Sequence, residues 1–582
     1  EILCIKLRGS TLIKGYKVSD IEFLLSLYAD DCTIFLEYNE ENLRNCIQIL
    51  KNFYHLSGLK IHVEKTKCII FGDKPESDNV LCADLNLKWE CEFELLGVKF
   101  DAFLRNMHVN LEEKIEEIEG VISNWRYRLL TPLGRCCVAK TLLLSKLSHL
   151  AIILPCIDKK IIMKIENLIY KYIWKGVDKV ARKCAKNSFR LGGLNFPDIL
   201  ASWKSFKFSW IRRVINTDAK WKLILSVHLK KLNIDSLDDL LSLGTADISM
   251  YSKKIESKFW SEVFSVIKPF MLEFVKKCPE ELIKCTIWGS DFFTRNGSIT
   301  HKKNYRHIPS EILRPIDILK QSSFISIEEI RAKYGTCDEE QYTSLKHLVK
   351  TSFMKYNVDI NLVTTNGPIR PSLLNLANLT NKGCSPWTRL LKHKYITDNS
   401  RKLEEKWNDT LGNIQSLDFW DRCYRNTENI FFNNTLKWFQ FQINRGTLKT
   451  NRIVSKFKTN VSEMCTLCGA EIETILHLFW DCEVTKKFIE STSNLLRIIF
   501  EGSPDLSSKK EFLFGSHASE IYEKFNYYWL HVKYYIWICR CKDQELSLIG
   551  FKSWLLFQLK LDNGFNSDKL RFIVEMIEKL TI

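Results

Sequence analysis

The chain has 582 residues, of which 45% are hydrophobic, and it carries a formal net charge of +16. This apolar content is sufficient for packed cores in several domains and argues against a disordered chain. Basic residues are spread along the sequence, which favours a polyanionic partner, nucleic acid before membrane. The alternative is a basic protein without such a partner.

The chain contains 20 cysteines, most of which stand singly, as Cys46, Cys68 and Cys137 do. The sequence shows no secretory signal and no apolar run of membrane length. This pattern predicts free thiols in a reducing, intracellular compartment rather than a disulfide framework. The chain starts at Glu1 and enters a strand-like run over residues 2–7, so we expect a piece of a longer product.

Two adjacent carboxylates lie between apolar runs, in the sequence Tyr28-Ala29-Asp30-Asp31. The runs predict a β-hairpin with Asp30 and Asp31 at its tip. Two carboxylates on a rigid tip suit Mg²⁺, which takes oxygen ligands and leaves positions open for phosphates in phosphoryl or nucleotidyl transfer. The alternative is an ordinary surface turn, because Asp is common in turns.

The hairpin is followed by a predicted helix that Asn39 caps and Gly58 ends. Residues 68–71 and 93–100 predict further strands, which gives the first part of the chain an α+β order.

Apolar residues then change from a period of 2 to a period of 3.6. A helical stripe opposite several glutamates is formed by Leu111, Ile115, Ile118, Ile122, Trp125 and Leu129. Thr131-Pro132 ends this helix, and residues 133–150 and 158–174 predict two more. We interpret these stripes as core. Residues 215–410 contain no chemical motif and are expected to be mostly helical connecting structure.

Cysteine and histidine converge in the spacing Cys465-x2-Cys468-x8-His477-x4-Cys482. Three thiolates and one imidazole supply the four ligands of a tetrahedral structural zinc site, with no position left for water. Gly469 provides the residue that a knuckle turn requires. The alternative is a chance spacing in a cysteine-rich chain.

Basic and aromatic residues alternate just before this spacing. Candidate nucleic-acid contacts are Lys437, Trp438, Arg445, Lys449, Arg452, Lys456 and Lys458, with Phe439, Phe441 and Phe457 among them. Cationic groups suit a phosphate backbone, and aromatic faces suit unstacked bases. Equally, the aromatics could be core and the charges a solvated face.

Several motifs occur in series: Leu27-Tyr28-Ala29-Asp30-Asp31, Ser57-Gly58-Leu59-Lys60-Ile61, Lys65-Thr66-Lys67 and Leu96-Gly97-Val98. They resemble the later palm motifs of reverse transcriptases from non-LTR (LINE-type) retrotransposons. The thumb and post-thumb region of that family is resembled by Trp125, Leu133-Gly134, Ile173-Trp174-Lys175-Gly176 and Leu191-Gly192-Gly193-Leu194. Its zinc-binding region is resembled by Cys465-x2-Cys468-Gly469, Glu473-Thr474, His477-Leu478-Phe479 and Cys482.

The resemblance implies an α+β architecture in four parts. These are a partial right-hand polymerase palm over residues 1–105, a helical thumb and post-thumb region over 106–215, a helical connecting region over 216–415 and a zinc-binding carboxy-terminal region over 416–582.

The resemblance also implies a nucleotidyltransferase that copies RNA into DNA. Asp30 would bind Mg²⁺, Asp31 would support the site or bind a second Mg²⁺, and Tyr28 would lie near the primer end. Lys65, or Lys67, would neutralise or protonate the departing pyrophosphate. The implied partners are an RNA template and a DNA primer or target, in a ribonucleoprotein of the cytoplasm and nucleus, without a membrane.

This sequence departs from the family at two points. His62 stands where the family commonly has an asparagine, and only 27 residues precede Tyr28, whereas a further catalytic aspartate precedes the hairpin in the family. Asp20 has the wrong context for that role. We therefore expect no templated primer extension from this chain alone. The alternatives are a zinc-containing nucleic-acid-binding remnant or domesticated protein without catalysis, and a helical scaffold.

Overall fold

The computed structural model divides the chain into two compact units, each built from several segments. It describes residues 2–29, 31–60, 62–72, 84, 87–155, 159–320, 323–359, 370–380, 383–392, 401–412, 416–429, 433–500, 506, 508–515, 520–563 and 571–581. The first unit comprises Glu1–Val121, Leu144–Ile165 and Ile199–Leu391. The second unit comprises Ile122–Leu143, Glu166–Asp198 and Lys392–Ile582.

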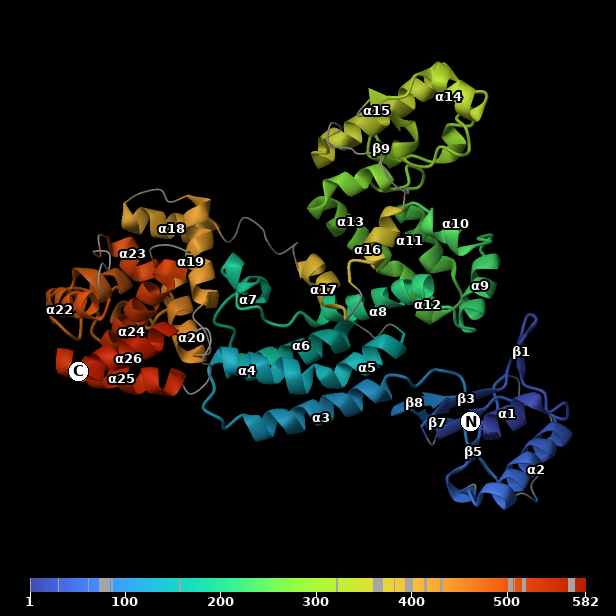
Figure 1. The fold of residues 1–582 in the computed structure, drawn as a ribbon, viewed down its shortest axis with the longest axis horizontal. Coiled ribbons are helices and arrows are strands. Elements are labelled where there is room, and N and C mark those ends of the chain that lie inside the picture. The colour runs from blue at the N-terminus through green and yellow to red at the C-terminus, as the bar shows by residue number, and fades with distance from the viewer. Residues whose placement is uncertain are drawn as a thin grey trace. The chain divides into compact units, whose positions relative to one another are not determined.

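The first unit begins with a small α+β region (Figure 1). Its elements are α1 (Ile2–Gly9), β1 (Tyr16–Val18), β2 (Ile21–Phe23), β3 (Leu25–Tyr28), β4 (Asp31–Ile34) and α2 (Glu40–Ser57). The strand expected over residues 2–7 is wrong, because this segment is helical. Cys4 and Leu7, three residues apart, face inward as α1 packs against α2.

The helix predicted between Asn39 and Gly58 is confirmed. The Asn39 side chain accepts hydrogen bonds from the backbone N–H groups of Glu41, at 2.8 Å, and Asn42, at 3.4 Å. Gly58 has a φ of +73° and donates its N–H to the Tyr54 carbonyl at 2.8 Å. Both helix ends are therefore satisfied locally by the residues that the sequence pattern identified.

Every sheet in the described ranges has two strands. β5 (Lys67–Cys68) pairs in parallel with β6 (Lys88–Trp89), and β7 (Glu92–Leu95) pairs with β8 (Val98–Asp101) as a hairpin. The strand structure expected over residues 93–100 is therefore present as two strands on either side of a turn. Leu96 and Gly97 both adopt positive φ values, 51° and 76°, as a tight two-residue hairpin turn requires.

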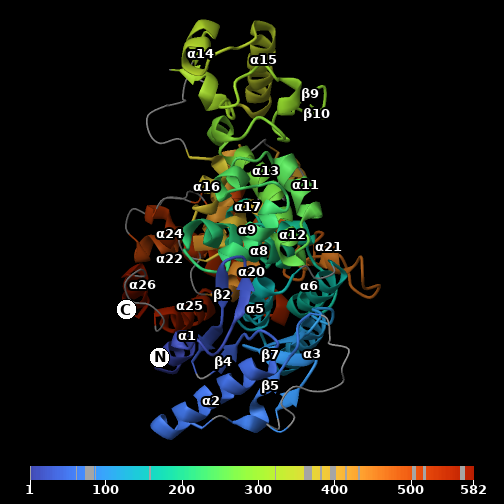
Figure 2. The same ribbon diagram turned by 90° about the vertical axis from the view of Figure 1, so that its right-hand side faces the viewer.

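The rest of the first unit is mainly helical. Its helices include α5 (Ser145–Ile153), α8 (Ile199–Asn216), α9 (Lys222–Lys230), α10 (Leu237–Leu241), α11 (Thr245–Lys254), α12 (Lys258–Ser265), α13 (Ile267–Lys277), α14 (Ile327–Tyr334), α15 (Glu339–Tyr356), α16 (Ser372–Ala377) and α17 (Ser385–Lys392). α12 and α16 pack against α8, and α11 packs against α12 and α13 (Figure 2). The Phe208 ring lies at the centre of this core, with Phe270 4.7 Å and Trp387 5.2 Å from its centroid. Residues 216–359 are thus mostly helical, as expected, with short hairpins at β9–β10 (Thr294–Arg295, Ser298–Ile299) and β11–β12 (Leu319–Lys320, Ser323–Phe324).

Three helices predicted after residue 110 occur, one of them interrupted. α3 spans Val109–Trp125 and α6 spans Lys159–Trp174. The helix expected over residues 133–150 divides into α4 (Pro132–Val138), a π-helical turn (Ala139–Leu143) and α5. Thr131 caps α4 through a 3.2 Å hydrogen bond from the Gly134 N–H to its hydroxyl.

The second unit is a helical assembly around α24 (Glu520–Lys542). Its other helices are α4, the end of α6, α7 (Arg182–Lys186), α18 (Arg401–Leu411), α19 (Leu417–Asn429), α20 (Asn434–Asn444), α21 (Asn451–Val454), α22 (Glu483–Ile499), α23 (Lys509–Phe514), α25 (Leu548–Asn563) and α26 (Arg571–Thr581). α20 packs against α4, α23 and α24, while α24 also contacts α22 and α25 (Figure 1).

Among the described residues, no single helix is long and apolar enough to cross a membrane. Pro132–Leu143 and Ser145–Ile153 satisfy the criterion of length and composition when they are counted together.

A buried lysine lies at the centre of the second unit. Lys533 of α24 donates hydrogen bonds to the Gln440 side-chain oxygen, at 2.6 Å, and to the Leu513 carbonyl, at 2.8 Å. Gln440 in turn donates to Asn444 at 2.7 Å, so neutral acceptors surround the ammonium group. Burial lowers the pKa of Lys533 to about 7.

This pKa predicts a dependence of stability on pH. A lysine side chain in an unfolded chain has a pKa of about 10.4. Between about pH 7 and pH 10, the unfolded chain therefore binds a proton that folded Lys533 lacks, and the free energy of unfolding rises with pH. In Lys533→Met, this part of the rise is expected to disappear. Urea unfolding of both proteins across this pH range measures the difference, and identical slopes would contradict the assignment.

Candidate metal centre and basic segment

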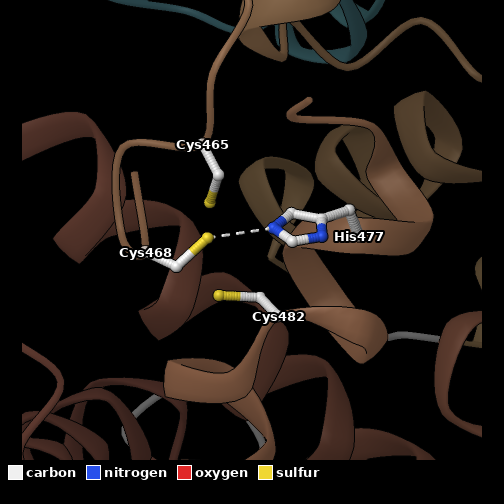
Figure 3. Close-up of side chains that lie close together, drawn as sticks. All are labelled: Cys465, Cys468, His477 and Cys482. Carbon is white, nitrogen blue, oxygen red and sulfur yellow. Dashed lines mark hydrogen bonds between the residues drawn. The ribbon is translucent and has the colours of Figure 1, made fainter. Parts of the chain in front are cut away.

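Four side chains with zinc-ligand chemistry converge in the second unit. The donor atoms of Cys465, Cys468, His477 and Cys482 all lie within 4.8 Å of one another (Figure 3). The Cys468 sulfur lies 3.3 Å from His477 Nε2. Tetrahedral zinc with bonds near 2.3 Å places its ligands about 3.8 Å apart, so the cluster has the dimensions of such a site.

A tight turn positions the first two cysteines. The Cys465 N–H donates to the Glu471 carbonyl at 2.7 Å, and the Gly469 N–H donates to the Cys465 carbonyl at 2.8 Å. Gly469 has a φ of +69°, which glycine adopts without strain. A bridge between Met464 and Ile472 closes the loop behind the turn. The knuckle predicted from the Cys-x-x-Cys-Gly sequence is present.

The other two ligands lie at a helix start. A π-helical turn, His477–Asp481, leads to Cys482, which precedes the first residue of α22. The Cys465 side chain and the backbone of Val484 and Thr485 lower the pKa of the Cys482 thiol against the effect of burial. A lowered pKa favours the thiolate, which is the form in which cysteine binds a metal.

The histidine has an acidic neighbour on its other side. Glu471 places a carboxylate oxygen 3.0 Å from His477 Nδ1, although the two atoms are not aligned as a good hydrogen bond. A carboxylate in this position orients a metal-binding imidazole with Nε2 toward the metal. Three sulfurs and one nitrogen, all from the protein, fit structural zinc with no open position.

A buried ion pair supports the knuckle from behind. Glu473 is fully buried and accepts hydrogen bonds from Arg540 of α24, with contacts of 2.6 to 3.2 Å. The same carboxylate accepts the N–H groups of Asn451, at 2.8 Å, and Thr466, at 3.1 Å. Arg540 also donates to the Asn451 side chain at 2.5 Å. Sequence reasoning identified Glu473 only through the family resemblance and missed Arg540, which lies 67 residues away and has no local signal.

The predicted nucleic-acid contacts fall into two structural groups. The first group lies on α20 or at its end and comprises Lys437, Trp438 and Arg445. The ring centroids of Trp438 and Trp174 are 6.0 Å apart. The Arg445 guanidinium donates a hydrogen bond to the Gly192 carbonyl at 2.5 Å. Phe439 and Phe441 are core residues. Exposed side chains belong to Lys449, Arg452, Lys456, Phe457 and Lys458, which we call the basic segment. The structure thus places some of these aromatic residues in the core and several of the basic residues on the surface. Contact with nucleic acid stays a prediction for all of them.

The candidate magnesium site lies in the first unit. β3 and β4 form the predicted hairpin, with Tyr28 paired opposite Asp31 and Ala29 in the turn at a φ of 54°. Tyr28 is 67% exposed and Asp31 is also exposed, whereas Asp30 lies outside the described residues. Lys65 is exposed at the end of a short 3₁₀ helix, Val63–Lys65. The catalytic roles assigned to these residues stay predictions.

One comparison with known proteins bears on the metal centre. A family model described as zinc-binding in reverse transcriptase matches residues 403–488. This range contains all four converging side chains, Glu473 and the basic segment. The chain therefore carries a zinc-binding region of the kind found in reverse transcriptases.

We predict one zinc ion per chain. Changing Cys465 and Cys468 together to Ser removes two of four ligands and is expected to abolish stoichiometric zinc, as measured by elemental analysis of the purified protein. Cys137→Ser, which changes an exposed cysteine far from the cluster in sequence, serves as the matched control and should retain zinc. Retention of zinc in the double variant would contradict the assignment.

Breaking the buried ion pair is expected to destabilise the second unit strongly. Arg540→Met leaves the Glu473 carboxylate buried without its cation, which costs about 3–5 kcal/mol in other buried pairs. Chemical unfolding of the zinc-loaded protein measures this loss, and Glu473→Gln added to Arg540→Met should recover part of it. Lys231→Gln, which breaks an exposed pair with Glu256, should leave stability nearly unchanged. Equal effects of the buried and exposed changes would argue against this role.

Proposed function

We propose that this chain acts in reverse transcription, within an RNA-directed DNA polymerase of the non-LTR (LINE-type) retrotransposon class, and that its second unit binds the nucleic acid. The observation that carries this proposal is the position of the basic segment within the matched zinc-binding region. The zinc cluster would support the basic segment, which exposes several cations and one aromatic ring. Such a surface suits single-stranded nucleic acid.

The zinc cluster and its supports hold the two ends of the basic segment. Leu448, Thr450 and Cys465 are buried, and the residues from 456 to 460 between them are exposed. Asn451 donates its side-chain N–H to the Met464 carbonyl at 2.7 Å, which ties the start of the segment to the knuckle. Ser455 donates to Glu463 at 3.0 Å and closes the middle of the loop. Zinc removal should therefore disorganise the segment and weaken nucleic-acid binding.

Phe457 is the aromatic group that the segment presents to solvent. Its ring is 83% exposed, between Lys456 and Lys458. Exposure of an apolar ring to water is unfavourable, and a nucleobase stacked on the ring would displace that water. The flanking ammonium groups can reach the phosphates on either side of the stacked base.

The polymerase chemistry proposed for the first unit follows the family resemblance. Asp30 and Asp31 would hold Mg²⁺ while a primer 3′-hydroxyl attacks the α-phosphorus of a nucleotide, and Lys65 would stabilise the departing pyrophosphate. Tyr28 lies beside Asp31 in the hairpin, which supports its placement near the primer end. The proposed partners are an RNA template and a DNA primer or target, in a ribonucleoprotein of the cytoplasm and nucleus.

A second candidate function is nucleic-acid binding without catalysis. One observation favours it: within the described ranges, β3 and β4 pair only with each other. An isolated two-stranded hairpin is marginally stable, whereas metal-ion catalysis needs carboxylates held rigidly.

Stacking on Phe457 gives the binding proposal a direct test. Phe457→Ala is expected to weaken binding of a labelled single-stranded RNA or DNA by about 1–3 kcal/mol, because one stacked base loses its platform. Fluorescence anisotropy measures the affinity, and circular dichroism and zinc content verify the fold. Phe557→Ala, which removes another exposed phenylalanine from α25, is the matched control. Equal affinities for the three proteins would refute the stacking role.

Primer extension separates the two candidate functions. Incorporation of nucleotides on an RNA template that needs Mg²⁺ and is abolished in Asp31→Ala would support catalysis by this chain. Zinc-dependent binding without any incorporation would favour the binding function.

A further inference from the structure

A second group of cations lies in the second unit, apart from Lys456, Phe457 and Lys458 of the basic segment. We call Arg135, Lys175, Lys179 and Lys449 the cation cluster. Arg135 belongs to α4, the next two residues follow α6, and Lys449 follows α20. α4 packs against α20, and Trp174 at the end of α6 packs against Trp438 of α20, which brings the three segments together.

Arg135 is buried, and no described residue accepts a hydrogen bond from its enclosed Nε atom. Its side chain is only 4% exposed. The nearby Tyr172 hydroxyl, close enough to interact electrostatically with Arg135, is also enclosed and also lacks a partner there. A buried cation and a buried hydroxyl without acceptors are costly to the folded chain. An anion bound beside them would supply the missing acceptors.

The three lysines of the cluster are exposed, and no described residue provides a counter-ion for them. Within the described part of the chain, the side chains of Lys175, Lys179 and Lys449 make no hydrogen bond or ion pair. Partial desolvation, followed by repulsion from Lys449, Arg135 and Lys175, lowers the pKa of Lys179. No described carboxylate offsets this repulsion at Lys179. The cluster is therefore a concentrated positive charge with one buried member, unlike a solvated face of alternating charges.

We propose that the cation cluster binds successive phosphates of a single nucleic-acid strand, with Arg135 as the buried contact to one phosphate and the lysines as contacts to its neighbours. This inference rests on the proposed function, because the strand is the one that the basic segment binds. Lys449 belongs to both sets and connects them along the chain. The strand would run from Phe457 past Lys449 to Lys175, Lys179 and Arg135.

The chemistry of the cluster selects phosphodiesters. A guanidinium presents a planar fork of N–H donors that matches two oxygens of one phosphate, and the Tyr172 hydroxyl can donate to the same group. The lysines act as point charges and need a ligand that carries charge at several places. A strand with one charge per nucleotide meets both requirements, whereas a single inorganic phosphate meets only the first.

The salt dependence of binding tests the lysines. For single strands, the slope of log affinity against log salt falls by about 0.7 for each phosphate that the protein no longer neutralises. In Lys175→Gln/Lys179→Gln, the slope for a labelled single-stranded oligonucleotide of about 16 nucleotides should therefore fall by roughly 1.4, with affinity reduced at low salt. Lys487→Gln/Lys552→Gln, which changes two exposed lysines of α22 and α25, should leave slope and affinity unchanged.

The stability of the free protein tests Arg135 separately. Because no described residue offers the Arg135 Nε atom an acceptor, Arg135→Met should leave the melting temperature of the zinc-loaded chain equal or higher while it weakens oligonucleotide binding at least tenfold. Arg135→Lys should recover part of that affinity. A residue that only holds the fold together would give the reverse result, a lower melting temperature with binding reduced in proportion to the unfolded fraction.

The outcomes also separate this inference from the proposed function. If Lys456→Gln/Lys458→Gln weakens binding but the Lys175 and Lys179 changes do not, the cation cluster is not part of the strand path and the inference is overturned. Full competition by millimolar inorganic phosphate, with no change of salt slope in any cluster variant, would likewise overturn it. Absence of salt-sensitive binding by the unaltered protein would instead overturn the proposed function itself.

Discussion

The buried Glu473–Arg540 pair is the interaction on which the zinc-binding part of the second unit depends. One carboxylate joins the zinc knuckle, the start of the basic segment and the longest described helix of this unit, α24. A buried carboxylate is tolerated only when its oxygens are fully used, and here four donor groups from three segments meet it. The pair therefore specifies where the knuckle attaches more than it adds to net stability.

Lys533 and Arg135, two further buried cations of this unit, are accommodated differently from Arg540. Arg540 has a carboxylate, Lys533 has only neutral acceptors, and Arg135 has no acceptor among the described residues. These three solutions have different consequences. The carboxylate fixes the position of Arg540. The neutral acceptors leave Lys533 with a pKa of about 7, so that it is partly deprotonated at neutral pH. Arg135 can accept an anionic ligand as its partner. Burial alone therefore does not tell a structural cation from a binding one.

Local signals predicted the elements that depend on local interactions. The capped helix α2, the β3–β4 hairpin and the Cys-x-x-Cys knuckle each have their determining residues within a few positions of one another. Residues 2–7 misled the prediction because a short apolar run fits a strand or a helix equally well, and packing against α2 decides. Arg540 and the cation cluster could not be predicted, because tertiary packing brings together residues that are far apart in sequence.

The two-stranded sheets of the first unit have a consequence for how the chain behaves. With only one partner per strand in the described ranges, β3 and β4 each have an outer edge whose backbone N–H and C=O groups can pair with another strand. Such an edge is a template for strand addition, and it accepts a strand of another polypeptide as readily as one of the same chain. The hairpin that carries Asp31 would gain rigidity from such a strand, and without one its edges can pair with a strand of a second copy of the chain.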